Sequence, residues 1–364
     1  MSFKILITDP LSDRGIEFLE KSGLEVIYKP NAEKTEIDEC LEYIDGWIIR
    51  SGTKISKENI LDAKKLQIIG RAGVGTDNID IESATQSGVV VMNVPDGNTI
   101  SAAEHTIAMM LSLSRNIQLG HMSLVQGAWN RHKLVGNELR DKILGVVGLG
   151  KIGREVIKRA LSFDMKIVGY DPYVTQDSFD ESEVKVISLN ELIKTSDYIT
   201  LHVPINDATR NLFNLEQMKQ MKKTSKIINV ARGGIINEND LILALNDNII
   251  SGAALDVYEN EPLDKNSGLL NAKNILLTPH LGASTFEAKE GVSLGVCKQI
   301  VEFFCNDKLL NALNIPVSDS SIMKKMLPYY KLSEKIGLIL SQLSSTAVKE
   351  VEVVCYGNAS DSKS

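Results

Sequence analysis

Cysteine is scarce in this 364-residue chain, and the few cysteines present are scattered. None belongs to a C-x-x-C pair or has a histidine nearby at metal-ligand spacing; the four are Cys40, Cys297, Cys305 and Cys355. This pattern excludes a disulfide framework and predicts no metal site. Isolated reduced thiols are typical of cytoplasmic proteins, so we expect that location.

Long apolar runs and an excess of positive charge are also missing. No hydrophobic run approaches the roughly 20 residues that a membrane-spanning helix needs. The N-terminal stretch MSFKILITD is too short and too polar for a signal peptide and predicts a first strand. The formal net charge of −7 argues against nucleic acid or a membrane surface as a partner. A small anionic substrate remains allowed, because a few Arg and Lys residues can build a local positive pocket.

What the sequence does contain is a regular alternation of short apolar runs and amphipathic stretches. The first five apolar runs are KILITD, LEVIY, GWIIRS, LQIIGRAG and GVVVMNV. Stretches with helical periodicity, such as SDRGIEFLEKSG and SKENILDAKK, lie between them. Alternation of this kind predicts an α/β fold, in which helices cover both faces of a parallel sheet.

The pattern is interrupted by a Pro/Gly/Asn connection, NVPDGNTIS, and then starts again. Ser101 and Glu104 have the spacing of a capping box and predict the start of a long helix. A second series runs from KILGVVGLG to NILLTPH, and a helix over about residues 285–306 returns to the first. We therefore expect two doubly wound domains with a ligand cleft between them. Their expected bounds are 1–98 with 285–316 for the first domain and 99–284 for the second.

The second series opens on a glycine-rich stretch, GVVGLGKIGREV, at residues 145–156. Gly148, Gly150 and Gly153 match the dinucleotide-binding fingerprint, although a tight strand-to-helix turn without a ligand fits the same match. The flanking sequence favours the ligand, because a strand precedes the glycines, a helix follows them, and the next strand ends at Asp171. An acid there accepts hydrogen bonds from the adenosine ribose and repels a 2′-phosphate. We therefore expect NAD as the cofactor.

Three ionisable residues follow later strands of the second series. They are Arg232 in INVARGGIIN, Glu261 in ALDVYENEPL and His280 in LLTPHLGAST. Taken singly, each also fits a solvated or structural position. Taken together on a dinucleotide-binding domain they suit acid–base chemistry, because His titrates near neutral pH, Glu can orient it and Arg can grip a carboxylate.

Several long motifs occur in order along the chain: RSGTKIS, GRAGVGTDNID, GNTISAAEHTIAMML, GLGKIGREV, YDP, ARGGIIN, ALDVYENEP and PHLGAST. With them the sequence resembles the D-isomer-specific 2-hydroxyacid dehydrogenases over nearly all of the chain to about residue 316. The resemblance implies a flavodoxin-like substrate domain, a Rossmann NAD domain and a catalytic trio of Arg232, Glu261 and His280. It also implies cofactor contacts in the turns, beside the three fingerprint glycines: Val74, Lys151, Ile152, Asp171, Val203, Val230, Asp256, His280 and Gly282.

The substrate that the resemblance implies is D-3-phosphoglycerate, oxidised with NAD to 3-phosphohydroxypyruvate in the first step of serine biosynthesis. Arg50 and Arg71 lie after strands of the first domain, where two guanidiniums suit a phosphate; structural ion pairs are the alternative. The other substrate contacts expected are Gly73, Val74, Gly75, Asn98, Arg232 and His280.

Two other functions stay open at this point. One is a glyoxylate or hydroxypyruvate reductase of the same family, against which the two arginines weigh. The other is an NAD(H)-sensing corepressor that docks protein partners. Such a protein needs an apolar peptide groove on the first domain, and the sequence shows no exposed apolar stripe there.

One further segment indicates how subunits assemble. QGAWNR resembles the family's dimer arm, which implies a homodimer or homotetramer in which Trp129 packs against the partner and Arg131 reaches its active site.

Residues 317–364 resemble the start of an intervening domain and predict a helix, LPYYKLSEKIGLILSQL, and one strand, KEVEVVCYG. No serine-binding regulatory domain follows in this sequence, so it gives no basis for feedback by serine.

Overall fold

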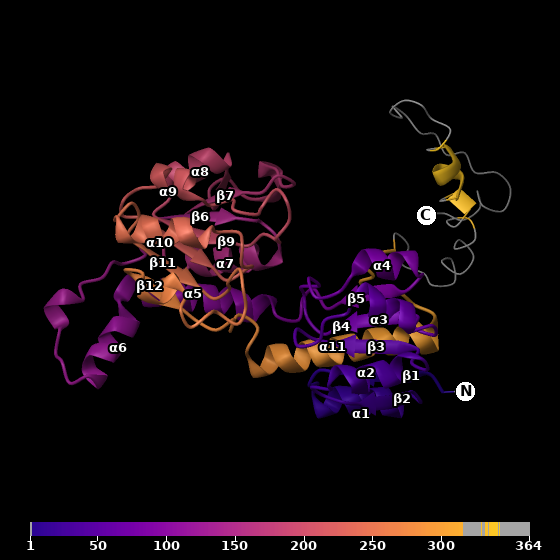
Figure 1. Ribbon diagram of the computed structural model, residues 1–364. Helices are drawn as coiled ribbons and strands as arrows, with labels where there is room; N and C mark the ends of the chain where they lie inside the picture. Colours follow the sequence, from indigo (N-terminus) through magenta and orange to yellow (C-terminus); the bar gives the residue numbers. More distant parts are fainter. Residues whose placement is uncertain (1, 316–328, 330–331, 334, 341, 343–364) are drawn as a thin grey trace. The chain divides into compact units, whose positions relative to one another are not determined.

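The computed structural model describes residues 2–315, 329, 332–333, 335–340 and 342. The chain divides into two compact units, which Figure 1 colours along the sequence. Unit 1 comprises Met1–Gly97 and Lys289–Ser364, and unit 2 comprises Asn98–Ala288.

Unit 1 is built on a five-stranded parallel sheet with the strand order β2-β1-β3-β4-β5. The strands are β1 Lys4–Ile7, β2 Glu25–Tyr28, β3 Gly46–Ile49, β4 Ile68–Arg71 and β5 Val90–Asn93. The helices are α1 Asp13–Lys21, α2 Lys34–Leu41, α3 Lys57–Asp62, α4 Ile81–Gln86 and most of α11 Phe286–Asn306. The five strands of the first series and the returning helix are thus confirmed.

Helices cover both faces of this sheet. One face, which includes Ile48 and Ile68, packs against α1 and α11, and the other, which includes Trp47 and Ile69, packs against α2, α3 and α4. Strands buried on both faces need apolar residues at consecutive positions, which explains the continuous apolar runs in the sequence. At Gly70 a Cβ would collide with Val296 of α11, so the helix lies close to the strand there.

Unit 2 is built on a seven-stranded parallel sheet with the order β12-β11-β10-β9-β6-β7-β8. The strands are β6 Ile143–Val147, β7 Lys166–Tyr170, β8 Val184–Val186, β9 Tyr198–Leu201, β10 Lys226–Asn229, β11 Gly252–Leu255 and β12 Ile275–Leu277. The α-helices are α5 Thr99–Arg115, α6 Ile117–Val125, α7 Lys151–Leu161, α8 Leu189–Thr195, α9 Leu215–Gln220 and α10 Glu238–Asn246. Short 3₁₀ turns are η1 Arg131–Lys133, η2 Gln176–Ser178 and η3 Gly268–Asn271.

The sheet of unit 2 is also covered on both faces. Helices α5 and α7 pack on one face, and α8, α9 and α10 pack on the other. Helix α6 differs, because it follows α5 after one residue, extends away from the sheet of unit 2 in Figure 1 and buries none of its own residues. Its exposed apolar side chains include Ile117, Leu119, Met122, Leu124 and Val125.

One expectation about local structure is wrong, and one strand was not predicted. The capping box does not form, because α5 begins at Thr99, and Ser101 lies inside its first turn with its hydroxyl 2.7 Å from that of Thr285. Glu104 instead pairs with Arg159 of α7. Strand β8 was not predicted, since its three residues are too few to show a periodic pattern.

The tail of the chain is described only in part. The described residues between 329 and 342 are helical, as predicted, whereas the strand predicted over 349–357 lies outside the described residues. No helix in the described part of the chain is long and apolar enough to cross a bilayer.

Ile69 tests the core of unit 1, because it is fully buried and lies opposite Trp47 in the sheet. Ile69→Ala leaves a cavity and is expected to lower the free energy of unfolding of unit 1 by about 2–5 kcal/mol. Trp47 and Trp129 are the chain's two tryptophans, so urea unfolding in a Trp129→Phe background reports on Trp47 alone. Leu61→Ala, at an exposed position of α3, is the matched control. An equal shift in both variants would contradict the packing described.

Candidate active site

The glycine-rich turn joins β6 to α7. Gly148 has a φ of +96°, and a Cβ there would collide with the carbonyl oxygen of His202. A Cβ at Gly153 would collide with the carbonyl oxygen of Gly148, so this glycine allows the helix to pack against the turn. A Cβ at Gly150 would meet no atom within 4 Å. Gly150 is also the N-cap of α7 and offers no side-chain oxygen to the first N–H groups of the helix, which leaves donors and space for an anion.

Asp171 follows β7 directly, as predicted. Its Oδ2 accepts a hydrogen bond of 2.9 Å from the backbone N–H of Leu149, inside the glycine turn. Its Oδ1 accepts a bond of 2.9 Å from Tyr173 N–H. The carboxylate is therefore fixed beside the turn, and each oxygen retains a lone pair for a further donor.

Arg232, Glu261 and His280 follow three neighbouring parallel strands, β10, β11 and β12, so all three come from one edge of the sheet. His280 Nδ1 and Glu261 Oε2 are 2.6 Å apart, the distance of a hydrogen bond from the ring N–H to the carboxylate. Glu261 Oε1 accepts a second bond, of 3.0 Å, from the backbone N–H of Tyr258. The structure thus joins the predicted acid–base pair and orients its carboxylate.

The two partners shift each other's pKa toward the ionised forms. The hydrogen bond from Glu261 raises the pKa of His280 above 6.5, and it outweighs burial and the positive charge of Arg232. Burial alone would raise the pKa of Glu261, but the bonds from His280 and Tyr258 outweigh it, so the pKa is lowered. This arrangement suits a base that must hold a proton once it has accepted one.

Glu238, which is not among the predicted site residues, supports the loop of Glu261. Its Oε1 accepts a hydrogen bond of 2.7 Å from the backbone N–H of Glu259. Burial, with the nearby charges of Glu259 and Glu261, raises the pKa of Glu238. The one available signal was its position at the start of α10, directly after the ARGGIIN motif.

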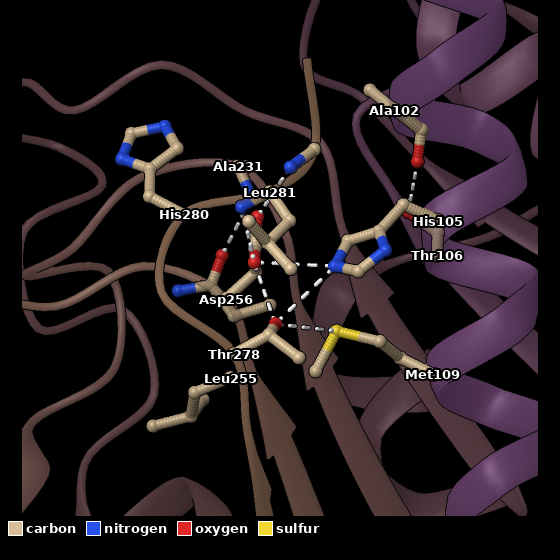
Figure 2. A network of polar contacts seen from close by, with 12 residues as sticks. Ala102, His105, Thr106, Met109, Ala231, Leu255, Asp256, Thr278, His280 and Leu281 are labelled. Carbon is tan, nitrogen blue, oxygen red and sulfur yellow. Dashed lines mark hydrogen bonds and ion pairs between the residues drawn. The ribbon is translucent and has the colours of Figure 1, made fainter. Parts of the chain in front are cut away.

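Asp256 was expected as a cofactor contact, and its carboxylate is fully buried. It accepts a hydrogen bond of 2.7 Å from the backbone N–H of Leu281 (Figure 2). It accepts another, of 2.8 Å, from the backbone N–H of the next residue, Gly282. A direct bond from this carboxylate to the cofactor stays a prediction.

The other expected cofactor residues of unit 2 also lie where strands end. Lys151 and Ile152 form the first turn of α7. Val203 follows β9 and lies beside Gly148, and Val230 follows β10 and lies beside Gly282. The remaining one, Val74, belongs to unit 1.

In unit 1, the two arginines expected to bind phosphate leave neighbouring strands. Arg71 ends β4 opposite Ile49, the last residue of β3, and Arg50 comes next after Ile49. The backbone N–H of Arg50 donates to Asp9 Oδ2 at 2.7 Å, which fixes the start of its loop. Asn78 Nδ2 donates to the carbonyl oxygen of Arg50 at 2.7 Å. Sequence reasoning missed both supports.

The loop of Gly73, Val74 and Gly75 follows Arg71 directly. Gly73 has a φ of +150°, and the Arg71 guanidinium occupies the space that a Cβ would take there. Asn93 Nδ2 donates to the carbonyl oxygen of Val74 at 2.6 Å and holds the loop.

Asn98, the expected substrate contact in unit 2, is the N-cap residue of α5 but makes no capping bond with its side chain. Its Oδ1 has no hydrogen-bond partner among the described residues.

Comparison with known proteins decides the family. Residues 107–282 match the family model "D-isomer specific 2-hydroxyacid dehydrogenase, NAD binding domain". The chain is 43% identical over 361 residues to the D-3-phosphoglycerate dehydrogenase of Methanocaldococcus jannaschii, which covers 99% of this chain and 68% of that protein. It is 40% identical over 356 residues to the D-3-phosphoglycerate dehydrogenase of Bacillus subtilis, and the alignment covers 98% of this chain and 67% of that protein. This chain belongs to the D-isomer-specific 2-hydroxyacid dehydrogenase family.

Solved structures agree with this assignment. The NAD-dependent formate dehydrogenase of Staphylococcus aureus, in complex with NAD, superposes with a TM-score of 0.76 at 30% identity and covers 87% of this chain and 100% of its own. A glyoxylate reductase from Paecilomyes thermophila superposes with a TM-score of 0.79 at 27% identity, and the match covers 86% of this chain and 98% of the reductase. The present chain spans about two thirds of the length of the curated relatives, from 58% to 68%.

Unit 2 of this family member is its NAD-binding domain, and the residues present fit NAD. The open space at Gly150 and the start of α7 suit the pyrophosphate, and Asp171 suits the ribose hydroxyls.

His280 provides a test that needs no substrate. If Glu261 raises the pKa of His280, then Glu261→Gln removes the carboxylate and is expected to lower that pKa toward its ordinary value. The measurement is a pH titration of the His280 ring signals by NMR. Glu259→Gln removes a neighbouring charge that makes no bond to the ring and is the control. A His280 pKa that is unchanged in Glu261→Gln would contradict the pairing.

Proposed function

We propose that this enzyme oxidises D-3-phosphoglycerate to 3-phosphohydroxypyruvate with NAD, the first step of serine biosynthesis. The observation that carries the proposal is the hydrogen-bonded pair of His280 and Glu261, with Arg232 on the next strand, at the strand ends of an NAD-binding unit. The names of the relatives support the substrate.

Bound NAD supplies the acceptor for the hydride that leaves C2. His280 Nε2, the ring nitrogen not bonded to Glu261, takes the proton of the C2 hydroxyl. Glu261 orients the ring through Nδ1 and stabilises the imidazolium that forms. Arg232 holds the substrate carboxylate and polarises the developing carbonyl oxygen. General-base catalysis of this kind typically contributes ~10²–10⁴ in rate, and fixed orientation adds to it.

Arg50 and Arg71 bind the phosphate in this proposal. Their placement at adjoining strand ends of unit 1 supports the assignment, since neighbouring strand ends bring two guanidiniums within reach of one dianion. Backbone N–H groups of Gly73, Val74 and Gly75 are proposed to receive the carboxylate, with Asn98 as a further contact.

A glyoxylate or hydroxypyruvate reductase is the second candidate. Structural neighbours that carry such names favour it, for example the NADPH-dependent enzyme of Sinorhizobium meliloti, with a TM-score of 0.78 at 25% identity. The two arginines favour the phosphorylated substrate, because a two-carbon or three-carbon acid without phosphate gives them no second anion to bind.

The exposed apolar side chains of α6 and the exposed Trp129 support assembly into a homodimer or homotetramer. Burial of these side chains against a second copy removes their apolar surface from water. We propose a cytoplasmic location as well, in keeping with the described cysteines, Cys40, Cys297 and Cys305, which are all free thiols.

A panel of hydroxy acids tests the proposed function. We expect NADH formation with D-3-phosphoglycerate to exceed that with D-glycerate and D-lactate, and phosphohydroxypyruvate to be reduced faster than glyoxylate in the reverse direction. The inactive control is His280→Asn, which removes the proposed base. Its turnover is expected to be lower by on the order of 10²-fold or more, with NADH affinity retained. Equal rates for D-3-phosphoglycerate and D-glycerate would favour the reductase.

Cofactor choice depends on Asp171. Its carboxylate repels a 2′-phosphate, so kcat/KM with NAD is expected to exceed that with NADP by on the order of 10²-fold. Asp171→Ala should narrow this ratio, whereas Asp177→Ala, a nearby exposed acid, should not. Steady-state kinetics with both cofactors measure it, and equal efficiency in the wild type would refute the assignment.

Substrate choice depends on the two arginines. Arg50→Ala or Arg71→Ala should raise the KM for D-3-phosphoglycerate about ten- to a hundredfold and change kcat less, because the phosphate lies away from the reacting carbon. Activity on D-glycerate should hardly change. Arg14→Ala, which removes an exposed arginine of unit 1, is the control. Equal losses on both acids would show that the arginines do not recognise the phosphate.

A further inference from the structure

His105 of α5, which is not among the predicted site residues, lies in a network of hydrogen bonds that includes Asp256. Its Nε2 is 3.1 Å from Asp256 Oδ1 and 3.2 Å from Thr278 Oγ1. Thr278 Oγ1 donates to the same Asp256 oxygen at 2.6 Å. Figure 2 shows this carboxylate between His105, which comes from the helix, and the turn at His280 and Leu281. The carboxylate oxygen of Asp256 can only accept a hydrogen bond, and Thr278 Oγ1 already donates its own hydrogen to it. His105 Nε2 therefore carries a hydrogen and donates it to Asp256.

The charge of Asp256 is held by these donors. Burial alone would raise the pKa of this carboxyl, but the bonds from His105 and Thr278 and from the Leu281 and Gly282 amides bring it below its ordinary value. His105 is the one of these donors that comes from a helix distant in sequence. It thereby connects the carboxylate to α5, which packs against the sheet of unit 2.

Asp256 in turn determines the path of the chain at His280. The backbone N–H of His280 donates to the carbonyl oxygen of Asp256 at 2.9 Å, and the next two N–H groups donate to its carboxylate. His280 is held at a φ of +54°, a left-handed conformation that is uncommon for a residue with a Cβ. Its ring points away from His105 in Figure 2. The ring nitrogen Nδ1 lies 2.6 Å from Glu261 Oε2.

We propose that His105 is a positioning residue for the reaction: its Nε2–H holds the Asp256 carboxylate, and that carboxylate holds the His280 turn in the conformation that pairs the ring with Glu261. The inference rests on the proposed function of His280 as the base. The bonds of the His105 ring go to Asp256 and Thr278, so it acts on the base through Asp256. What it supplies to the carboxylate is the Nε2–H donor.

Three variants of His105 test the proposal in the full-length protein. His105→Leu removes the donor. His105→Asn keeps a polar side chain that is too short to reach Asp256, and it covers the case in which the leucine variant fails to fold. His105→Gln places an amide N–H near the position of Nε2 and restores the donor without an ionisable ring. Glu104→Gln, one residue away and exposed on the same helix, is the matched control.

The first readout needs no substrate. Hydrogen–deuterium exchange by mass spectrometry follows the amides of residues 278–285, and NADH fluorescence titration measures cofactor affinity. We expect faster exchange of this segment in His105→Leu and His105→Asn, near wild-type exchange in His105→Gln and Glu104→Gln, and NADH affinity within about threefold throughout. Exchange that is unchanged in both donor-less variants would overturn the proposal, even if the chain proved to act on another substrate.

The second readout is the effect of each variant on kcat and, separately, on KM with D-3-phosphoglycerate as substrate. Displacement of a catalytic group lowers kcat, here by about 10- to 100-fold in His105→Leu and His105→Asn, with KM little changed. His105→Gln should recover kcat to within about threefold and keep the wild-type pH profile. A glutamine variant as slow as the leucine variant, or a leucine variant as fast as wild type, would refute the role of the donor. A wild type inactive on D-3-phosphoglycerate would instead refute the proposed function, and the exchange measurement would still decide the positioning role.

Discussion

The turn that carries His280 depends on one buried carboxylate. Asp256 accepts hydrogen bonds from two side chains and two backbone amides, and its own carbonyl oxygen accepts a third amide from the same turn. A buried carboxylate without donors would cost several kcal/mol, so these groups constrain the turn to the arrangement that satisfies them. The imidazole reaches Glu261 from a backbone that is already ordered, which reduces the entropy lost when the substrate binds.

Parallel sheets account for the rest of the site within each unit. Strands that all run in one direction bring their carboxyl ends to one edge, so residues far apart in the sequence, such as Asp171 and His280, follow strands of the same sheet. The same rule places Arg50 beside Arg71 in unit 1. Local backbone supports then set each side chain: Tyr258 N–H for Glu261, Leu149 N–H for Asp171 and Asn93 for the loop at Val74.

Sequence reasoning reached the features that depend on short-range pattern. The alternation of apolar runs predicted both sheets, and the spacing of Gly148, Gly150 and Gly153 predicted a turn in which two of the three glycines have no room for a Cβ. It failed where a tertiary contact competes with a local rule, as at Ser101, whose hydroxyl bonds to Thr285 rather than capping its helix. It also gave His105 no role, because its partner Asp256 lies 151 positions away and no periodicity links the two. Three-residue β8 was too short to detect.

In the proposed reaction, this chain moves a hydride from C2 of D-3-phosphoglycerate to NAD. The most direct measurement uses D-3-phosphoglycerate with deuterium at C2, incubated with the enzyme and unlabelled NAD in ordinary water, with the reduced cofactor analysed by mass spectrometry. We expect NADH that is one mass unit heavier, because the deuterium is transferred directly and does not exchange with solvent. NADH without deuterium, or no reduced cofactor at all, would contradict it.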